Sequence, residues 1–413
     1  MKMLKWLLCL LLAGTGLFAD AGELNITSFT LDNSELVFKT ADSGTVHHNY
    51  RVEMATSLVS AAWSVHRTVV GVGASASVTN TATTTNTASM FYRVVATSNS
   101  ATFVDGSYMV VDLSGGANAV SYPVVYYRKQ ADVPSGANSD IYKTSKLLLR
   151  LIPKGTFTMG YRAQEYPGAS DSGLHTVTLT KDFYIGVFEV TQRQWELVMG
   201  NKPSYFYNAT YYATRPVEQV SYYDIRENPA NSAISPNWPE SSQTHTNSFM
   251  GKLRTKTGLS TFDLPTESQW EYACRAGTTT ALNTGYNLTN TVSDVRMNVV
   301  GRYTYNGGLI SGTTYPSPGC TTSNGTAKEG SYLPNAWGLY DMHGNVWEWC
   351  LDWYGQYPGT VSDPLGSSTG SGRVIRCGGW DDNAILCRSA LRGNGAPNYQ
   401  FYYVGFRAAR TLP

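Results

Sequence analysis

Two cysteines near the C-terminal end are the residues whose type and spacing best suit a chemical role. Cys377 and Cys387 lie in the segment RCGGWDDNAILCRSALR, which is also rich in glycine and arginine. Paired thiolates bind soft metal ions or take part in redox reactions, and two thiols that meet in space can form a disulfide. The segment therefore raises two interpretations, a site that does chemistry and a cysteine pair that only holds the fold.

A second candidate lies in residues 339–354, LYDMHGNVWEWCLDWY. Asp341 and Glu348 supply carboxylates, while Gly344 and Val346 can offer backbone carbonyls from a turn. Calcium takes six to eight oxygen ligands of this mixed kind in a loose geometry. Solvated acidic residues beside core tryptophans would produce the same pattern, so both interpretations stay open at this point.

The N-terminus, MKMLKWLLCLLLAGTGLFADAG, has the pattern of a secretory signal peptide over residues 1–19. Lysines precede a short apolar run, and small residues follow as cleavage sites. The apolar run is too short to span a bilayer, and we expect no membrane span later in the chain. We therefore expect an exported protein, periplasmic or extracellular. Without Cys9, five cysteines remain, an odd number that leaves the pairing open.

Composition excludes several classes of protein. Lys and Arg number 31 and Asp and Glu 30, a balance that argues against nucleic-acid binding. Aromatic residues make up 12% of the chain, and there are 39 glycines. This profile is typical of a loop-rich, β-rich extracellular fold in which large rings hold irregular segments.

The chain divides into two predicted domains. Residues 20–115 alternate short Val-, Tyr- and Thr-rich runs with turn residues, the pattern of a fibronectin-like or immunoglobulin-like β-sandwich. Residues 116–145 form a linker. Residues 146–413 form the second domain, in which three short helices are marked by capping pairs: Thr191 with Gln194, Ser221 with Asp224, and Thr266 with Gln269. Cys274, on the apolar face of the third helix, is expected to be a buried core residue or one half of a disulfide rather than a reactive thiol.

Six motifs of the second domain occur in a familiar order. They are GTFTMG, FYIGVFEVTQRQW, RPVEQVSYYDI, LPTESQWEYACRAG, NAWGLYDMHGNVWEW and RCGGW…CRSALR…VGFRAAR. In this order they resemble the formylglycine-generating enzyme (sulfatase-modifying factor) family, over residues 146–413. The resemblance implies an α+β, C-type-lectin-like fold with low regular secondary structure, and it implies structural Ca²⁺.

The resemblance also implies which residues bind metal. It carries a calcium site onto Asp341, Gly344, Val346 and Glu348. Asn298 and Val299 match the first two ligands of a second calcium site, whose acidic partner has no counterpart near Thr321.

Active members of the family use Cu⁺ bound by two cysteines, and they convert a sulfatase cysteine to formylglycine with O₂. By resemblance Cys387 matches the second copper cysteine, while Asp382 stands at the position of the first. A carboxylate is a poor ligand for Cu⁺, so the substitution predicts impaired activity. Cys377, which the family pattern lacks, is the other candidate ligand. A Cys377–Cys387 disulfide, two structural thiols, or a zinc or iron site are the alternatives.

A function of another class is a non-catalytic, calcium-stabilised binding module. Its recognition surface would be formed by the tyrosine-rich loops YFYNATYY (205–212) and PNYQFYYVG (397–405), which could equally be packing segments. Its partner would be a sulfatase polypeptide or another secreted protein. We expect His343 to be a hydrogen-bonded loop residue, and Arg388, Arg392 and Arg407 to tie loops together rather than bind phosphate.

Overall fold

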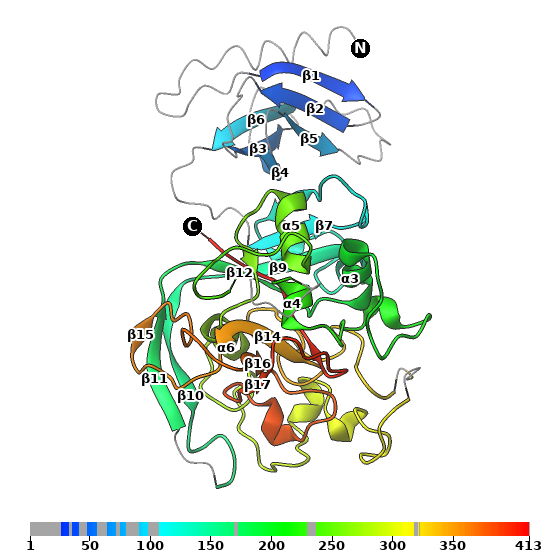
Figure 1. Cartoon of the computed structure of the whole chain (residues 1–413). Coiled ribbons are helices and arrows are strands. Elements are labelled where there is room, and N and C mark those ends of the chain that lie inside the picture. Colours follow the sequence, from blue (N-terminus) through cyan, green and yellow to red (C-terminus); the bar gives the residue numbers. More distant parts are fainter. Residues whose placement is uncertain are drawn as a thin grey trace. The chain divides into compact units, whose positions relative to one another are not determined.

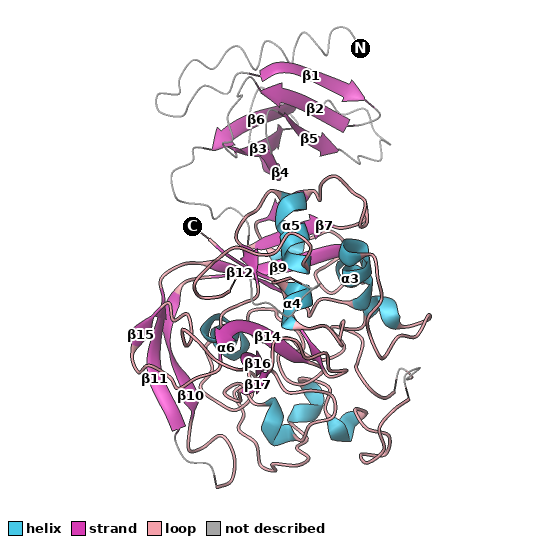
Figure 2. Ribbon diagram, in the orientation of Figure 1, coloured by secondary structure: helices cyan, strands magenta, loops and turns pink. Residues whose placement is uncertain are grey.

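The structure is a computed structural model of the chain, and it forms two compact units (Figures 1 and 2). It describes residues 26–32, 35–40, 48–55, 64–71, 75–79, 91–97, 107–168, 172–228, 237–317, 321 and 323–412, with side chains from residue 107 onward. Unit 1 comprises residues 1–107 and 124–132, and unit 2 comprises residues 108–123 and 133–413. The predicted signal peptide lies outside the described residues. Within them, no helix is both long and apolar enough to cross a membrane.

Unit 1 contains two antiparallel sheets, with strand orders β1-β2-β5 and β8-β4-β3-β6. Strands form where the alternating pattern predicts them, because β-branched and aromatic residues favour the pleated backbone. The sandwich fold itself stays a prediction. The strands are β1 (Ile26–Asp32), β2 (Glu35–Thr40), β3 (His48–Ala55), β4 (Ser64–Gly71), β5 (Ser75–Thr79), β6 (Phe91–Thr97) and β8 (Val124–Tyr127).

Unit 2 has three small sheets, with orders β13-β19-β12-β9-β7, β10-β11-β15 and β17-β16-β14-β18. Its strands are β7 (Tyr108–Asp112), β9 (Lys146–Ile152), β10 (Gly155–Tyr161), β11 (Ser172–Leu179), β12 (Phe183–Gly186), β13 (Phe262–Asp263), β14 (Trp347–Trp353), β15 (Val361–Ser362), β16 (Arg373–Arg376), β17 (Gly393–Gly395), β18 (Val404–Gly405) and β19 (Ala409–Thr411). β7 pairs antiparallel with β9, so unit 2 begins before the predicted boundary at residue 115 and includes most of the predicted linker.

The helices are short and lie on this irregular body (Figure 2). They are α2 (Ile141–Thr144), α3 (Gln192–Met199), α4 (Tyr222–Ile225), α5 (Phe249–Thr257) and α6 (Glu267–Arg275), with 3₁₀ turns at Gln130–Asp132, Tyr212–Thr214, Met297–Val299, Thr304–Asn306 and Ala384–Cys387. All three predicted capping boxes are present: Thr191, Ser221 and Thr266 each accept a backbone N–H at the start of a helix. The prediction of capped helices on a loop-dominated body is confirmed.

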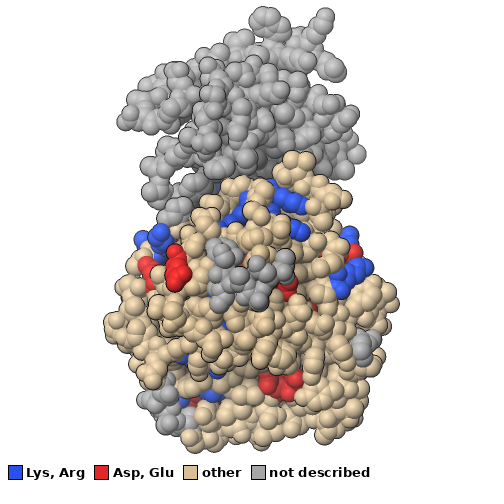
Figure 3. Space-filling model, viewed as in Figure 1, with Lys and Arg blue, Asp and Glu red and all other residues tan. Residues whose placement is uncertain are grey.

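Aromatic side chains form much of the interior of unit 2. Trp195, Trp270, Trp349 and Trp380 are fully buried, and Cys274 is buried as predicted. Few charged side chains lie on the face of unit 2 that Figure 3 shows. Many charged side chains lie instead inside the domain, where they pair with one another and fix the loops.

Candidate functional site

The C-terminal segment folds back on itself directly after β16. Gly378 adopts a φ of 75°, and a Cβ there would lie 2.8 Å from the sulfur of Cys387. Glycine is therefore required, both for its left-handed backbone and for this close approach. The turn brings Asp382 and Cys387 to the backbone of the same residue: the N–H of Gly379 donates to Oδ2 of Asp382 at 2.8 Å, and the carbonyl oxygen of Gly379 lies 4.0 Å from Sγ of Cys387.

Asp382, at the predicted position of the first copper ligand, is held by hydrogen bonds. Besides Gly379, the indole Nε1 of Trp347 donates to Oδ2 of Asp382 at 2.7 Å. Burial raises the pKa of Asp382, while the two donors lower it. The carboxylate therefore has a structural role in closing the turn.

Cys387, the predicted second copper ligand, is fully buried. Burial raises the pKa of its thiol well above the usual value, and the charges of Asp382 and Asp381 raise it further. Nδ1 of His343 donates to the carbonyl of Cys387 at 2.7 Å, because Nε2 accepts from the N–H of Asn283. His343 is thus the hydrogen-bonded loop residue expected, and burial lowers its pKa to about 4. At neutral pH, Cys387 is a protonated thiol.

Cys377 and Cys387 are both free thiols, so the disulfide considered above is not formed. Sγ of Cys377 donates instead to the carbonyls of Gly344 at 3.0 Å and Asp341 at 3.3 Å. Its φ is 91°, a region that costs a residue with a side chain about 1–3 kcal/mol. Within the described residues, Cys377, Asp382 and Cys387 do not form a group whose ligand atoms all lie within 4.8 Å of one another.

The loop predicted to bind calcium is buried in the centre of unit 2. Oδ2 of Asp341 accepts the N–H of Gly330 at 2.7 Å, whereas its Oδ1 has no hydrogen-bond partner. The carboxylate of Glu348 is paired with Arg407 through two bonds of 2.6 and 2.7 Å, and it also accepts from Trp270. An orphaned carboxylate oxygen of this kind fits a cation, but the sulfur of Cys377 lies among the expected oxygen ligands.

Sequence reasoning missed two residues of this site, Glu189 and Glu329. Oε2 of Glu189 accepts from Asn345 at 2.6 Å, and Oε1 accepts the N–H of Val346 at 3.2 Å. Burial raises the pKa of Glu189 well above its usual range, and nearby carboxylates raise it further; the same holds for Glu329. The only sequence signal was a single Glu in an otherwise apolar strand-to-helix run, FYIGVFEVT.

The second predicted calcium site has less support. Asn298 and Val299 are exposed, and the carbonyl of Val299 accepts the N–H of Leu333 at 2.9 Å. Among the described residues, the one cluster of three acidic, histidine or cysteine ligand atoms lies elsewhere, at Glu189, Glu348 and Cys377. The second calcium site stays a prediction.

An aromatic group lies beside the turn, and its members come from both tyrosine-rich loops. We call it the aromatic rim; it consists of Tyr205, Phe206, Tyr315, Trp380, Tyr402 and Tyr403. Trp380 forms its base, with ring centroids 5.0 Å from Phe206 and 5.8 Å from Tyr315. Asp381 is close enough to raise the pKa of Tyr402 and Tyr403 through its charge, after burial. Asp381 thus lies between the aromatic rim, whose Trp380 precedes it in the chain, and Asp382, which follows it.

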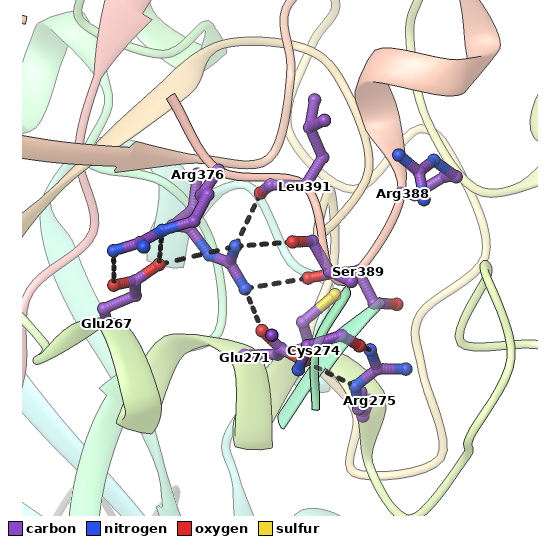
Figure 4. A network of polar contacts seen from close by, with 12 residues as sticks. Glu267, Glu271, Cys274, Arg275, Arg376, Arg388, Ser389 and Leu391 are labelled. Carbon is purple, nitrogen blue, oxygen red and sulfur yellow. Dashed lines mark hydrogen bonds and ion pairs between the residues drawn. The ribbon is translucent and has the colours of Figure 1, made fainter. Parts of the chain in front are cut away.

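A buried network of ion pairs fixes the segment behind the rim (Figure 4). Arg376 contacts Glu271 on α6 and also donates to the carbonyls of Ser389, Ala390 and Leu391. The arginines predicted to tie loops do so: they pair as Arg388 with Glu165, Arg392 with Glu267 and Arg407 with Glu348. The network leaves these guanidinium groups committed to protein carboxylates.

Unit 2 is similar in sequence to several known proteins. The family model described as the sulfatase-modifying factor enzyme 1-like domain matches residues 143–412. The chaperone protein LppX of Paenibacillus barcinonensis is 32% identical over 249 residues, which are 57% of this chain and 82% of that protein. The formylglycine-generating enzyme of Mus musculus is 26% identical over 326 residues, 72% of this chain and 84% of that enzyme.

One further relative matches a shorter part of the chain, and one solved structure is similar in fold. The formylglycine-generating enzyme of Thermomonospora curvata is 34% identical over 157 residues, 35% of this chain and 48% of the enzyme, so the chain spans about half of it. Among solved structures, Treponema denticola variable protein 1 is similar with a TM-score of 0.49 and 27% identity, over 65% of this chain and 96% of that one.

Proposed function

Because the chain belongs to the sulfatase-modifying factor enzyme 1-like family, we propose that it is an exported member that binds a polypeptide partner and has lost copper-dependent oxidation. The aromatic rim and Asp381 form the binding surface. The secretory pattern of residues 1–19 supports export. The single observation that carries the proposal is the replacement of one copper thiolate by Asp382, whose oxygen is held by Trp347 and Gly379.

The residues present do not fit Cu⁺. Monovalent copper selects soft sulfur ligands, and a single buried sulfur beside a carboxylate offers only one. The thiol of Cys387 must also lose its proton to bind, and its burial and the neighbouring Asp381 and Asp382 oppose this loss. Cys377 directs its sulfur to the carbonyls of another loop.

The rim has the chemistry of a recognition surface for a cationic side chain. Tyrosines present large apolar area with little loss of conformational entropy, and their faces attract cations. Tyr315 is 56% exposed, whereas Asp381 lies mostly buried beside it and has no ion pair within the described residues. Glu165 and Glu271, by contrast, are paired with arginines. An unpaired carboxylate close to Tyr402 and Tyr403 favours a Lys or Arg side chain of the partner.

The proposal is tested by peptide display against the purified, full-length protein. We expect enrichment of Lys- or Arg-containing peptides, with binding strongly weakened in Asp381→Asn and Tyr402→Ala. Tyr286→Ala, at an exposed tyrosine on a different segment, is the matched control and should leave binding unchanged. Peptides bound equally by all variants, or no enrichment at all, would remove the recognition function.

The second candidate function is the family's oxidation of a sulfatase cysteine to formylglycine. The retained sulfur of Cys387, at the position of the second copper cysteine, is the observation that favours it. Its test is O₂ consumption by the Cu⁺-treated protein in the presence of a cysteine-containing sulfatase-motif peptide. We expect no consumption above a Cys387→Ser control; turnover that this substitution abolishes would establish the oxidase instead.

A further inference from the structure

A group of buried acidic side chains lies beside Cys377 in the interior of unit 2. We call it the acid–thiol cluster; its members are Glu189, Glu329, Asp341, Glu348 and Cys377, and all are at most 1% exposed. One ligand atom from each of Glu189, Glu348 and Cys377 lies within 4.8 Å of the other two. Three elements distant in sequence therefore bring potential metal ligands to one point: the segment before α3, β14, and the turn after β16.

The negative charge of the cluster exceeds the positive charge beside it. Arg407 pairs with Glu348, but Glu189, Glu329 and Asp341 form no ion pair with Lys or Arg in the described part of the chain. Oδ1 of Asp341 and Oε2 of Glu329 are buried and receive no hydrogen bond. Glu329 lies within hydrogen-bonding reach of the carboxyls of both Glu189 and Asp341. Buried carboxylates that face one another need protons or a cation between them.

The backbone here is held in an unfavourable conformation that places the sulfur in the cluster. Cys377 has a φ of 91°, and Asp341 and Asn345 have φ values of 54° and 69°. Glycine would adopt the conformation of residue 377 without strain, but it would supply no ligand. Such strain persists where the surrounding structure or a function maintains it. What the cysteine adds at this position is a sulfur atom within 4.8 Å of a carboxylate oxygen of Glu189 and of Glu348.

The sulfur of Cys377 determines which class of metal ion suits the cluster. Calcium binds oxygen ligands, and the thiol of Cys377 already donates to the carbonyl of Gly344, one of the oxygens expected for calcium. Zinc binds Cys sulfur at about 2.3 Å and carboxylate oxygen at about 2.0–2.2 Å, so its ligands lie roughly 3–4 Å apart. The separations of up to 4.8 Å in the cluster need only a small contraction to reach this geometry.

We propose that the acid–thiol cluster binds a thiophilic divalent cation of the Zn²⁺ class through Cys377, Glu189 and Glu348. Oδ1 of Asp341 and Oε2 of Glu329, which receive no hydrogen bond, are candidates for a further ligand. On binding, the metal–sulfur bond replaces the S–H bond of Cys377, and the thiol proton is released to solvent. No electron is transferred, and the cation neutralises the carboxylates that lack an arginine.

The experiment uses the purified, reduced, full-length protein after metal removal with a chelator. Co²⁺ serves as the probe, because its thiolate complex gives a near-ultraviolet charge-transfer band that Zn²⁺ abolishes by displacement. We expect one equivalent of Co²⁺ to produce this band in the wild-type protein. In Cys377→Gly, which suits the local φ and should fold, the band should be absent. Zn²⁺ affinity should then fall by more than the roughly 10–100-fold that loss of an outer-shell partner costs.

The matched control is Cys387→Ser, which removes the other buried thiol of the same segment and should keep the band. Glu189→Gln should weaken Zn²⁺ binding while the band remains at high Co²⁺. Absence of the band in the wild-type protein would overturn the proposal, as would its loss in Cys387→Ser rather than in Cys377→Gly. If Cys377→Gly bound Ca²⁺ and Zn²⁺ with the same affinities as the wild-type protein, the site would use oxygen ligands only and the proposal would be wrong. None of these results depends on the binding function proposed above.

Discussion

The indole N–H of Trp347 donates to Oδ2 of Asp382 at 2.7 Å. Trp347 stands at the first position of β14, and its backbone N–H donates to the carbonyl of Tyr403 at 2.8 Å. One residue thus connects Asp382, which by resemblance stands at the predicted position of a copper cysteine, to the rim loop 397–405. These bonds give Asp382 a structural function in joining two loops.

The first prediction concerns Asp382→Cys. The substitution supplies a second soft ligand close to Cys387, so Cu⁺ affinity should rise at least tenfold over the wild-type protein. It should also lower stability by about 1–3 kcal/mol, because the donors of Trp347 and Gly379 lose their charged acceptor. Competition for Cu⁺ with a chromogenic chelator measures the first effect, and urea unfolding measures the second.

The control for this prediction is Asp382→Asn, which keeps an acceptor oxygen and adds no sulfur. Its Cu⁺ affinity should match the wild-type value. If both variants bind Cu⁺ equally, or if Asp382→Cys gains nothing in a folded protein, then residue 382 does not lie where a second sulfur could reach the ion.

The second prediction is a pH dependence of partner binding. Burial raises the pKa of Asp381 to about 7, and the charge of Asp382 adds to the effect. Below pH 7 the carboxyl is neutral and attracts a cation weakly, and above pH 7 it is charged. Affinity for a Lys- or Arg-containing peptide should therefore rise about tenfold between pH 6 and pH 8, in proportion to the ionised fraction. Fluorescence anisotropy across this range measures it.

Asp381→Asn removes the ionisation and should give weak binding that does not change over the same range. A wild-type profile as flat as that of the variant would exclude Asp381 as the group that contacts the cation.

Local signals in the sequence predicted much of the fold of unit 2. Capping pairs such as Thr191 with Gln194 act over three residues, so they can be read without knowing the tertiary structure. The resemblance likewise located Asp341, Glu348 and the turn around Asp382 in one domain, and the family match over residues 143–412 confirms that domain.

What the sequence could not predict depends on contacts between distant segments. Glu189 reaches Val346 across 157 positions, and no local pattern marks it as a partner of Glu348 and Cys377. The orientation of Cys377 follows from a left-handed φ that a sequence motif does not reveal. That Cys377 and Cys387 are free thiols and not a disulfide could be seen only from the path of the turn in three dimensions.

The third prediction concerns the buried ion pairs in Figure 4. Glu271 contacts Arg376 and pairs with Arg275 at 2.8 Å, with all three side chains at most 3% exposed. Glu271→Gln should lower the free energy of unfolding by about 3 kcal/mol, because it removes the nearest counter-charge of two buried guanidinium groups. Within the part of the chain that the structure describes, Arg376 then keeps only Glu267 at 3.6 Å, and Arg275 keeps only Glu165 at 3.4 Å. The exposed pair of Lys328 with Asp140 is the comparison, and Lys328→Ala should cost about 1 kcal/mol or less. Equal effects in denaturant unfolding would contradict a structural role for the network.

The last prediction separates backbone strain from steric contact at the turn. Gly378 and Gly359 have φ values of 75° and 83°, so an alanine is strained at either position. At Gly359 nothing lies within 4 Å of an added Cβ, whereas at Gly378 the Cβ would meet the carbonyl of Leu386 at 2.6 Å and the sulfur of Cys387 at 2.8 Å. Gly359→Ala should therefore cost about 1–2 kcal/mol, and Gly378→Ala should cost about 1–3 kcal/mol more because the turn is overpacked. Urea unfolding compares the two. Peptide binding should weaken only in Gly378→Ala, because displacing Leu386 and Cys387 also shifts the turn that carries Asp381. Similar losses of stability and of binding in both variants would mean that the turn does not position the rim.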